Sequence, residues 1–200
     1  MSKHVLGVGV MALRVAALTL GLTGLVYPLV VTGLAQLLFA PAANGSLVTG
    51  DKGEVVGSEL IAQPFTRPAY FQPRPSAAGA HGFDGTASGG SNLGVTSVKL
   101  RARARAELER LQRENPEAPA VAPAELLTAS ASGLDPHLSP ASVLWQLPRV
   151  ARARGVAPER VRRLVAEYTE GRDLGFLGEP RVNVLLLNLG LDRQFGRPGP

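Results

Sequence analysis

The longest apolar stretch of the chain lies near its N-terminus, over residues 15–40. It reads VAALTLGLTGLVYPLVVTGLAQLLFA and contains no charged side chain in 26 positions. A helix of about 20 apolar residues, rising about 1.5 Å per residue, is long enough to cross a hydrocarbon core about 30 Å thick. The pattern therefore predicts a transmembrane helix over 15–40, preceded by a short N-terminal segment of residues 1–14.

The charges on the two sides of this helix predict its orientation. Lys3 and Arg14 precede the apolar run, whereas the first acidic residue, Asp51, follows it. Because short basic flanks stay in the cytoplasm, we expect residues 1–14 to be cytoplasmic and the C-terminal part to face outward. A cleaved signal peptide is the alternative, since residues 40–42 resemble a cleavage site. Signal peptides have an apolar core of only about 7–15 residues, so the length favours an uncleaved anchor.

The predicted membrane span also contains residues that a helix surrounded only by lipid does not need. Pro28 removes one backbone donor, which requires a small kink or a neighbouring hydrogen-bond partner. Small and weakly polar residues suit close packing of one membrane helix on another. Together these residues indicate a partner within the membrane: Thr19, Gly21, Thr23, Gly24, Thr32, Gly33 and Gln36.

Three segments beyond the anchor have the spacing of apolar residues that is typical of helices. In the second, Ser139 and Pro140 suit the first positions of a helix, and Gly155 suits the position just past its last turn. Pro148 interrupts this helix, where we expect it to bend or restart. The predicted helices cover residues 96–114, 139–155 and 157–171.

Strands and loops are predicted between these helices. β-Branched and apolar residues at short spacing predict strands over 55–65, 126–130 and 181–192, the last turning near Asn188. Three prolines make residues 67–77 extended, and six glycines make residues 78–95 a long loop. Strands and helices alternate without a strict βαβ rhythm. We therefore predict an α+β fold, with one N-terminal transmembrane helix, a connector over 41–57 and a single extracytoplasmic mixed α/β domain over 58–200.

Composition narrows the possible chemistry. The chain contains no cysteine, which excludes disulfide bonds, thiol catalysis and Cys-ligated zinc. The three histidines, His4, His81 and His137, are scattered, and His81 with Asp84 supplies too few ligands for a metal site. Nineteen basic and sixteen acidic residues follow the apolar run. We expect no bound metal, and a domain outside the cytoplasm makes nucleic acid an unexpected partner.

One short segment places the residue types of a hydrolase together. Ser132, Asp135 and His137 lie within six positions in TASASGLDPHLSP. A catalytic serine needs its base within about 3 Å, and residues so close in sequence across a proline rarely reach that geometry. Gly133 suits a left-handed turn and Asp135 before a proline suits the start of a turn. The segment is therefore predicted to form turns, with no catalytic residues.

Two further motifs are open to a functional interpretation. The glycine-rich SGGSNLG, residues 88–94, lacks the lysine of a phosphate-binding loop, so we interpret it as a sharply turned or flexible loop. Arg149, Arg152 and Arg154 follow Gln146 on a predicted helix. They form either a docking patch or a solvated face.

Several longer strings resemble one known family. GSELIAQPF, YFQPRPSA, SGGSNLG, TASASGLDPHLSPASVLWQLPRVARARG and GEPRVNVLLLNLGLD together resemble the C chain of the potassium-transporting Kdp ATPase, in order from the N-terminal span almost to Leu191. SNLGVTS departs from this pattern, because family members more often have a proline after the glycine. SASG departs too, since SGSG is frequent there.

The resemblance implies a non-catalytic subunit of an ATP-driven potassium import complex in the inner membrane. Its partners would be a potassium-channel-like A chain, a P-type ATPase B chain and a small F chain. Members of the family have been described as catalytic chaperones that raise the ATP affinity of the B chain, with ATP in a ternary complex, or as outward elements that stabilise the assembly. We expect no directly bound cofactor. An anchored extracytoplasmic enzyme and a free-standing binding module are the alternatives.

The loop over 82–94 and the segment over 132–149 are the predicted contact surfaces for these partners. An outward domain would not reach cytoplasmic ATP, so contact with other subunits is the expected role of its exposed loops. The candidate contact residues are Ser91, Asn92, Asp135, His137, Gln146 and Arg149.

Overall fold

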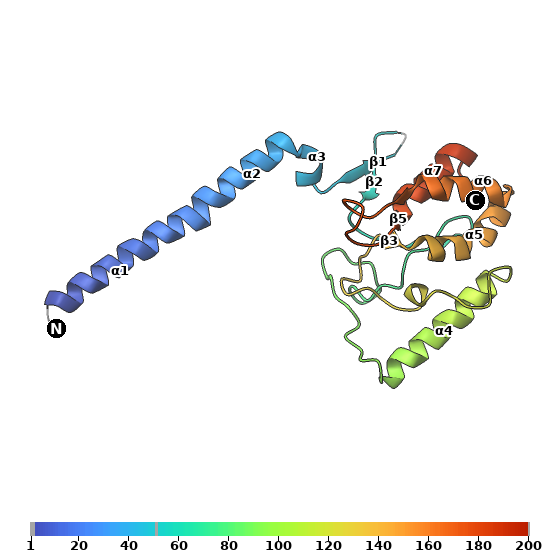
Figure 1. The fold of residues 1–200 in the computed structure, drawn as a ribbon, viewed down its shortest axis with the longest axis horizontal. Coiled ribbons are helices and arrows are strands. Elements are labelled where there is room, and N and C mark those ends of the chain that lie inside the picture. Colours follow the sequence, from blue (N-terminus) through green and yellow to red (C-terminus); the bar gives the residue numbers. More distant parts are fainter. Residues whose placement is uncertain (1–2, 51, 200) are drawn as a thin grey trace. The chain divides into compact units, whose positions relative to one another are not determined.

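The computed structural model describes residues 3–50 and 52–199, with side chains from residue 5 onward. It divides into two compact units, Met1–Leu47 and Val48–Pro200, which are described separately below (Figure 1). The outermost residues of the predicted ranges 1–14 and 58–200 lie outside the described residues, as does Asp51.

The first unit is one long helix followed by a short one. α1 (Lys3–Gly21), the π-helical turn η1 (Leu22–Val26) and α2 (Tyr27–Leu38) follow one another without a break, and α3 (Ala40–Ala43) comes after them. Residues Val5–Leu38 are long and apolar enough to cross a membrane, and none of them is buried inside the protein. The predicted long apolar helix is confirmed, and its helical backbone begins at Lys3 rather than near residue 15.

The π turn lies directly before Pro28. A proline cannot donate to the carbonyl four residues earlier, and its ring crowds that carbonyl. The wider turn over Leu22–Val26 relieves this crowding, and the Tyr27 N–H donates to the Leu22 carbonyl, five residues back. The Thr23 hydroxyl donates to the Thr19 carbonyl at 2.8 Å. The helix therefore continues past the proline through a local change of helix type.

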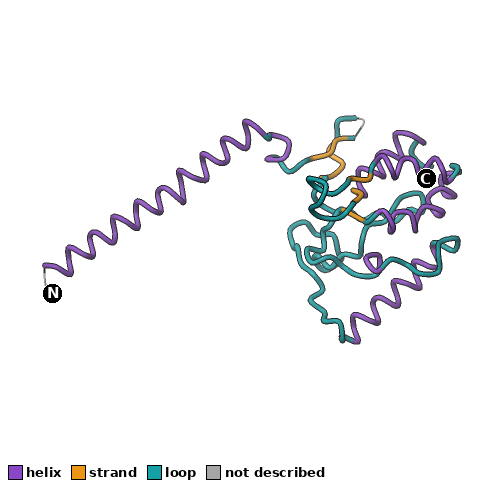
Figure 2. Tube along the Cα trace, in the orientation of Figure 1, coloured by secondary structure: helices purple, strands orange, loops and turns teal. Residues whose placement is uncertain are grey.

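The second unit combines small sheets with four helices of ten or more residues (Figures 1 and 2). β1 (Leu47–Thr49) pairs with β2 (Val55–Ser58). A three-stranded sheet has the order β3-β5-β4, with β5 (Arg181–Asn183) antiparallel to both neighbours. His137 of β3 (His137–Leu138) pairs with Asn183, and Thr169 of β4 (Thr169–Glu170) pairs with Val182. The mixed α/β class is confirmed, although its strands are shorter than predicted.

The three predicted helices are present, although the third ends at Glu167 and not at 171, because Thr169 and Glu170 pair with β5 instead. They are α4 (Val98–Glu114), α5 (Pro140–Arg154) and α6 (Pro158–Glu167). The Ser139 hydroxyl accepts from the Ser142 N–H at the start of α5, and Gly155 ends it with φ +63°. α5 continues through Pro148 without a restart, because the carbonyl that loses its donor belongs to the partly exposed Leu144.

Two predicted strands are wrong. Residues 126–130 form no strand, since the 3₁₀ turn η2 (Ala124–Leu126) is followed by irregular backbone. The segment 181–192 is strand only as far as Asn183, after which α7 (Val184–Phe195) begins. The Asn183 side chain accepts from the Leu186 N–H and caps this helix. A leucine-rich run fits either element by its spacing, and here the cap selects the helix.

The core lies between α5, α6, α7 and the three-stranded sheet. α6 packs against both α5 and α7, and Phe71, Val143 and Leu187 are fully buried in one apolar cluster. Trp145 also lies there, and its indole N–H donates to the Pro119 carbonyl at 2.8 Å. Tyr70 packs against Phe65 at the edge of this cluster. The core thus anchors the extended segment that contains residues 65–72.

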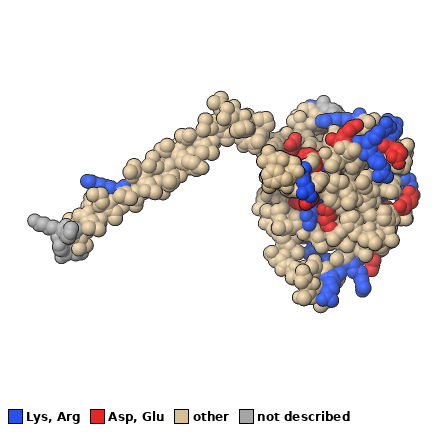
Figure 3. Space-filling view, viewed as in Figure 1, with Lys and Arg blue, Asp and Glu red and all other residues tan. Residues whose placement is uncertain are grey.

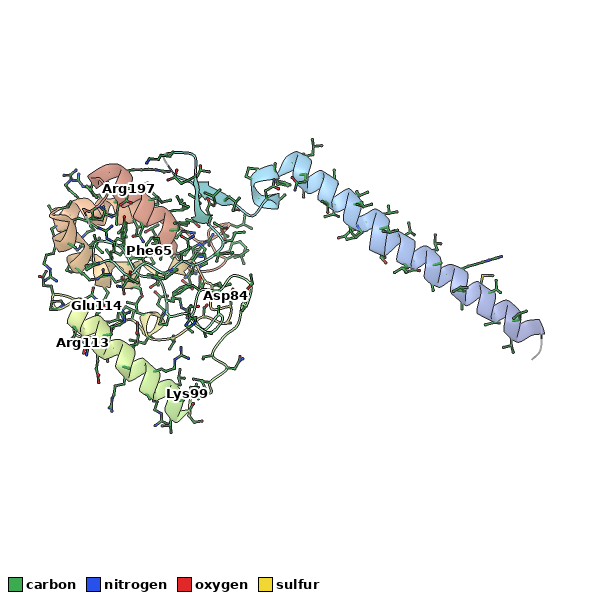
Figure 4. The ribbon with its side chains drawn as sticks, turned by 180° about the vertical axis from the view of Figure 1, so that it is seen from behind. Phe65, Asp84, Lys99, Arg113, Glu114 and Arg197 are labelled. Carbon is green, nitrogen blue, oxygen red and sulfur yellow. The ribbon has the colours of Figure 1, made fainter. Side chains whose placement is uncertain are left out.

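Charge is distributed very differently in the two units. Figure 3 shows the long helix almost without charged atoms, whereas Lys, Arg, Asp and Glu are spread over the second unit. The N-terminal half of α4 has basic side chains without an acidic residue among them, from Lys99 to Arg105. Figure 4 places Lys99 near one end of α4 and Arg113 and Glu114 near the other.

Candidate functional site

The domain's extended segment is held by side-chain amides instead of by a neighbouring strand. The Gln146 amide accepts from the Gln72 N–H at 2.9 Å and donates to the Gln72 carbonyl at 3.0 Å. The Asn188 amide pairs in the same way with Phe71, at 2.9 Å for both bonds. Each amide therefore satisfies one donor and one acceptor of a backbone that makes no sheet contact.

Arg149 reinforces this arrangement from α5. Its guanidinium donates to the carbonyls of Pro68 and Tyr70 at 2.6 and 2.9 Å, and to the side chains of Asn115 and Gln146 at 2.8 and 2.7 Å. Burial lowers the pKa of Arg149 to about 10, so the side chain stays charged at neutral pH. Four carbonyl oxygens accept hydrogen bonds from the buried guanidinium, and the negative charge of Glu114 also favours its charged form.

Two candidate contact residues are therefore used inside the domain. Gln146 is fully buried and Arg149 is 3% exposed. The expected docking patch or solvated face of arginines on α5 is also wrong for Arg154, whose side chain is buried against Asp192 at 2.8 Å. Only Arg152 of the three is well exposed, and it pairs with Glu117. Gln146, Arg149 and Arg154 fix the extended segment, and their residue types alone did not indicate this role.

The glycine-rich loop packs against the segment that contains Asp135. The Gly89 N–H and the Ser88 hydroxyl both donate to the Ser132 carbonyl, at 2.8 and 3.1 Å. A Cβ on Gly133, whose φ is +68°, would lie 2.6 Å from the Gly89 carbonyl oxygen. Glycine is required there for both its backbone conformation and the close approach of the two loops.

The Ser76 hydroxyl joins the same two loops. It donates to the Gly133 carbonyl at 2.6 Å and accepts from the Phe83 N–H at 2.7 Å. We call the combined surface of residues 78–94 and 130–137 the loop surface. The two predicted contact segments therefore meet in space, although about forty residues separate them in the sequence.

Asp135 forms the predicted turn on this surface. Its carboxylate accepts from the His137 N–H at 3.0 Å and from the Arg74 guanidinium at 3.1 Å, and the His137 ring nitrogen Nδ1 lies 3.6 Å away. The hydrogen bond from His137, followed by the charge of Arg74, lowers the pKa of Asp135 against the opposing effect of partial burial. The Ser132 hydroxyl instead accepts from the Leu134 N–H.

Four of the six candidate contact residues lie on the loop surface. Asn92 is exposed and has φ +50°, whereas Ser91, Asp135 and His137 are half-buried. A hollow of about 590 Å³ beside Ser91 is lined by polar and basic side chains, among them Lys99. The surface is thus polar, and its hollow faces basic residues of α4.

A second cluster was not predicted. Arg110 binds Glu107 and Glu114 on α4, and one Arg110 nitrogen donates to the Gln72 amide oxygen at 3.0 Å. The two carboxylates raise the pKa of Arg110. Glu107 and Glu114 lie three and four positions from Arg110 on one helix. This spacing was the sequence signal that could have revealed the cluster.

This cluster lines a pocket of about 420 Å³ together with Phe65, Phe83 and Arg74. The Arg74 Nε is buried without a hydrogen-bond partner, although another nitrogen of the same side chain binds Asp135. Arg74 also lines the hollow next to Ser132 and therefore links the pocket to the loop surface. Within the described residues, no three His, Asp or Glu side chains group as metal ligands do.

Comparison with known proteins identifies the family. The family model described as "K+-transporting ATPase, c chain" matches residues 10–193. The Potassium-transporting ATPase KdpC subunit of Myxococcus xanthus is 68% identical over 185 residues, covering 92% of this chain and 87% of the relative. The subunit of the same name from Koribacter versatilis is 53% identical over 179 residues, covering 90% and 91%. The chain belongs to the KdpC family and is a KdpC subunit of the K+-transporting ATPase.

Proposed function

We propose that this chain is a non-catalytic subunit that assembles and stabilises the potassium import complex from the outer side of the inner membrane. Its partners are a potassium-channel-like A chain, a P-type ATPase B chain and a small F chain. The observation that supports this role most directly is the division into one apolar helix over Val5–Leu38 and one separate compact domain.

The orientation follows from charge. Lys3 lies at the N-terminal end of the long helix, and Arg14 is the one charged residue between Val5 and Leu38. Basic residues favour the cytoplasmic side, whereas Asp51 and every other acidic residue follow the helix. With the N-terminus in the cytoplasm, the single span places residues 48–200 outside. There the domain is close to other outward surfaces of the complex and far from cytoplasmic ATP.

A docking role, rather than catalysis, suits the side chains of the domain. The Ser132 hydroxyl is used in a turn, and the nearby His137 ring faces Asp135 instead. Gln146, Arg149 and Asn188 hold the extended segment rigidly. A rigid domain that displays polar loops contributes to assembly by offering a preformed surface, which reduces the entropy lost on association. The loop surface, with Asn92 at an exposed position, is the proposed contact region.

An effect on ATP affinity then follows indirectly. If the domain stabilises the conformation of the complex that binds ATP more tightly, it raises ATP affinity at the B chain through the linkage between the two sites, as a catalytic chaperone would. ATP in a ternary complex with this chain requires the domain to lie in the cytoplasm. The orientation of residues 48–200 therefore decides between the two mechanisms.

Thiol labelling tests the orientation, since the native chain has no cysteine. Val95→Cys places a thiol at a position that is 89% exposed. A membrane-impermeant maleimide should label it in intact cells, whereas the matched Ser2→Cys should react only after permeabilisation. The reverse pattern would contradict the proposed orientation and favour direct ATP contact. Denatured cells report total reactivity.

Deletion tests the assembly role separately. A chain ending at Leu47 keeps the long helix and loses the domain. We expect the other subunits to separate during purification and potassium-stimulated ATP hydrolysis to fall with them. An intact and fully active complex would contradict the proposal.

A further inference from the structure

An exposed hairpin tip joins β4 to β5. All ten residues from 171 to 180 are exposed, in contrast to the buried Val182 that follows. Three large apolar side chains lie within this tip: Leu174 is 82% exposed, Phe176 69% and Leu177 49%. Single exposed apolar residues are common on protein surfaces, but three within four positions form a patch that indicates an interaction site.

The tip is an ordered turn rather than a loose loop. Asp173 and Leu177 exchange two backbone hydrogen bonds of 2.9 Å and form an antiparallel bridge. The N–H groups of Gly175 and Phe176 donate to the carbonyls of Arg172 and Asp173, at 3.1 and 3.2 Å. Four hydrogen bonds thus fix the backbone that presents the apolar side chains.

Leu174 adopts a backbone conformation that leucine seldom uses. Its φ is +52°, in the left-handed region where glycine and asparagine are the favoured residues. Burial of the Leu174 side chain does not offset this strain, because the residue is 82% exposed. A strained backbone combined with an exposed apolar side chain is best explained by a contact made outside this chain.

The charges around the tip favour a protein over a lipid surface as its occupant. Arg172 pairs with Glu179 at 2.7 Å, and Arg181 pairs with Asp173 and Glu170 at 3.2 and 3.0 Å. Three acidic residues therefore face two arginines, and neither arginine is left to attract anionic headgroups. A loop that inserts into a membrane gains from basic flanking residues, whereas a protein interface combines an apolar core with a polar rim.

We propose that Leu174, Phe176 and Leu177 insert as a preformed anchor into an apolar groove on another protein subunit of the K+-transporting ATPase. This inference rests on the proposed function, because it requires the chain to assemble with other subunits. It adds a second contact region to the polar loop surface. An ordered aromatic and aliphatic anchor is the kind of feature that supplies most of the affinity in a protein interface.

Cysteine protection tests this directly. Phe176→Cys is introduced into the full chain, and the rate of maleimide reaction is measured for the chain alone in detergent and for the purified complex. Val121→Cys, at an 83% exposed position, is the matched control. We expect the thiol at 176 to react at least tenfold more slowly in the complex, with no such change at 121. A smaller change at 176 in an assembled complex overturns the anchor.

Two further measurements separate the alternatives. The Phe176→Cys chain is also placed alone in vesicles of phosphatidylethanolamine and phosphatidylglycerol. A maleimide reaction at position 176 that is slower in these vesicles than in detergent would overturn the proposal, because lipid would then cover the tip. Phe176→Asp should lower recovery of the other subunits at least fivefold relative to Val121→Asp, and equal recovery overturns the anchor. If even the unaltered chain fails to assemble, the proposed function itself has failed.

Discussion

The side-chain amide of Asn188 on α7 forms two 2.9 Å hydrogen bonds with the backbone of Phe71, 117 positions earlier in the chain. Asn188 is 1% exposed and Phe71 is fully buried. A single amide thus replaces the strand that would otherwise pair with this backbone, and it does so inside the apolar core.

Asn188→Leu should destabilise the domain by about 3 kcal/mol. The substitution leaves a buried N–H and a buried carbonyl without partners, and each costs about 1–3 kcal/mol. Urea unfolding of the full chain in detergent, followed by fluorescence of the single tryptophan, Trp145, gives the change. The exposed Gln112→Leu should alter stability by less than about 0.5 kcal/mol. Equal stabilities for the two variants would contradict the role given to Asn188.

Arg149→Lys should cost about 2 kcal/mol although it keeps the positive charge. Lysine lacks the planar fork that reaches the carbonyls of Pro68 and Tyr70 together with two side-chain amides. Arg152→Lys is the matched control, since its side chain is 52% exposed and pairs only with Glu117. The same unfolding assay compares the two. A similar small loss for both would show that charge alone is needed at position 149.

Asp135 should make stability depend on pH in the acid range. Its pKa is lowered in the folded domain, so its contribution is fully present above the unfolded pKa of about 3.9. That contribution is lost as the pH falls through the folded pKa. Asp135→Asn should therefore be less stable than the native chain at pH 7, and the gap should close in strong acid. Glu159→Gln, at an exposed position, should show no such convergence.

Gly133→Ala should be far more damaging than Gly155→Ala. Both glycines have positive φ, +68° and +63°, so both substitutions carry a backbone cost of about 1 kcal/mol. At Gly133 the new Cβ would also meet the Gly89 carbonyl oxygen at 2.6 Å, whereas nothing lies within 4 Å at Gly155. Urea unfolding midpoints of the two variants compare these costs. Equal effects would contradict the close approach.

The sequence predicted the parts of the fold that depend on local signals. Ser139 and Gly155 marked the ends of α5 correctly because capping uses only neighbouring backbone groups. The turn at Asp135 was predicted for the same reason. The segment after Asn183 was wrong as a strand, because leucine spacing allows both elements and the deciding cap is one side chain.

The parts that depend on distant contacts could not be predicted. Gln146 and Arg149 looked like surface residues because glutamine and arginine usually are. Their burial results from carbonyls and amides of residues 68–72, which lie more than seventy positions earlier. The hairpin tip was missed as well. Its apolar residues carry no sequence signal for exposure, and only the structure shows Phe176 in solvent.

The extended segment around Phe71 has a consequence for the order in which the domain folds. Its backbone partners are synthesised long after it, at Gln146, Arg149 and finally Asn188. Until those residues leave the ribosome, the backbone of residues 68–72 lacks its hydrogen-bond partners, and this hydrophobic segment stays exposed. Folding is therefore a late, non-local event, and long-range closure of this kind is slow. A chain interrupted before α7 would leave this segment available to chaperones and proteases, even though its long N-terminal helix is already complete.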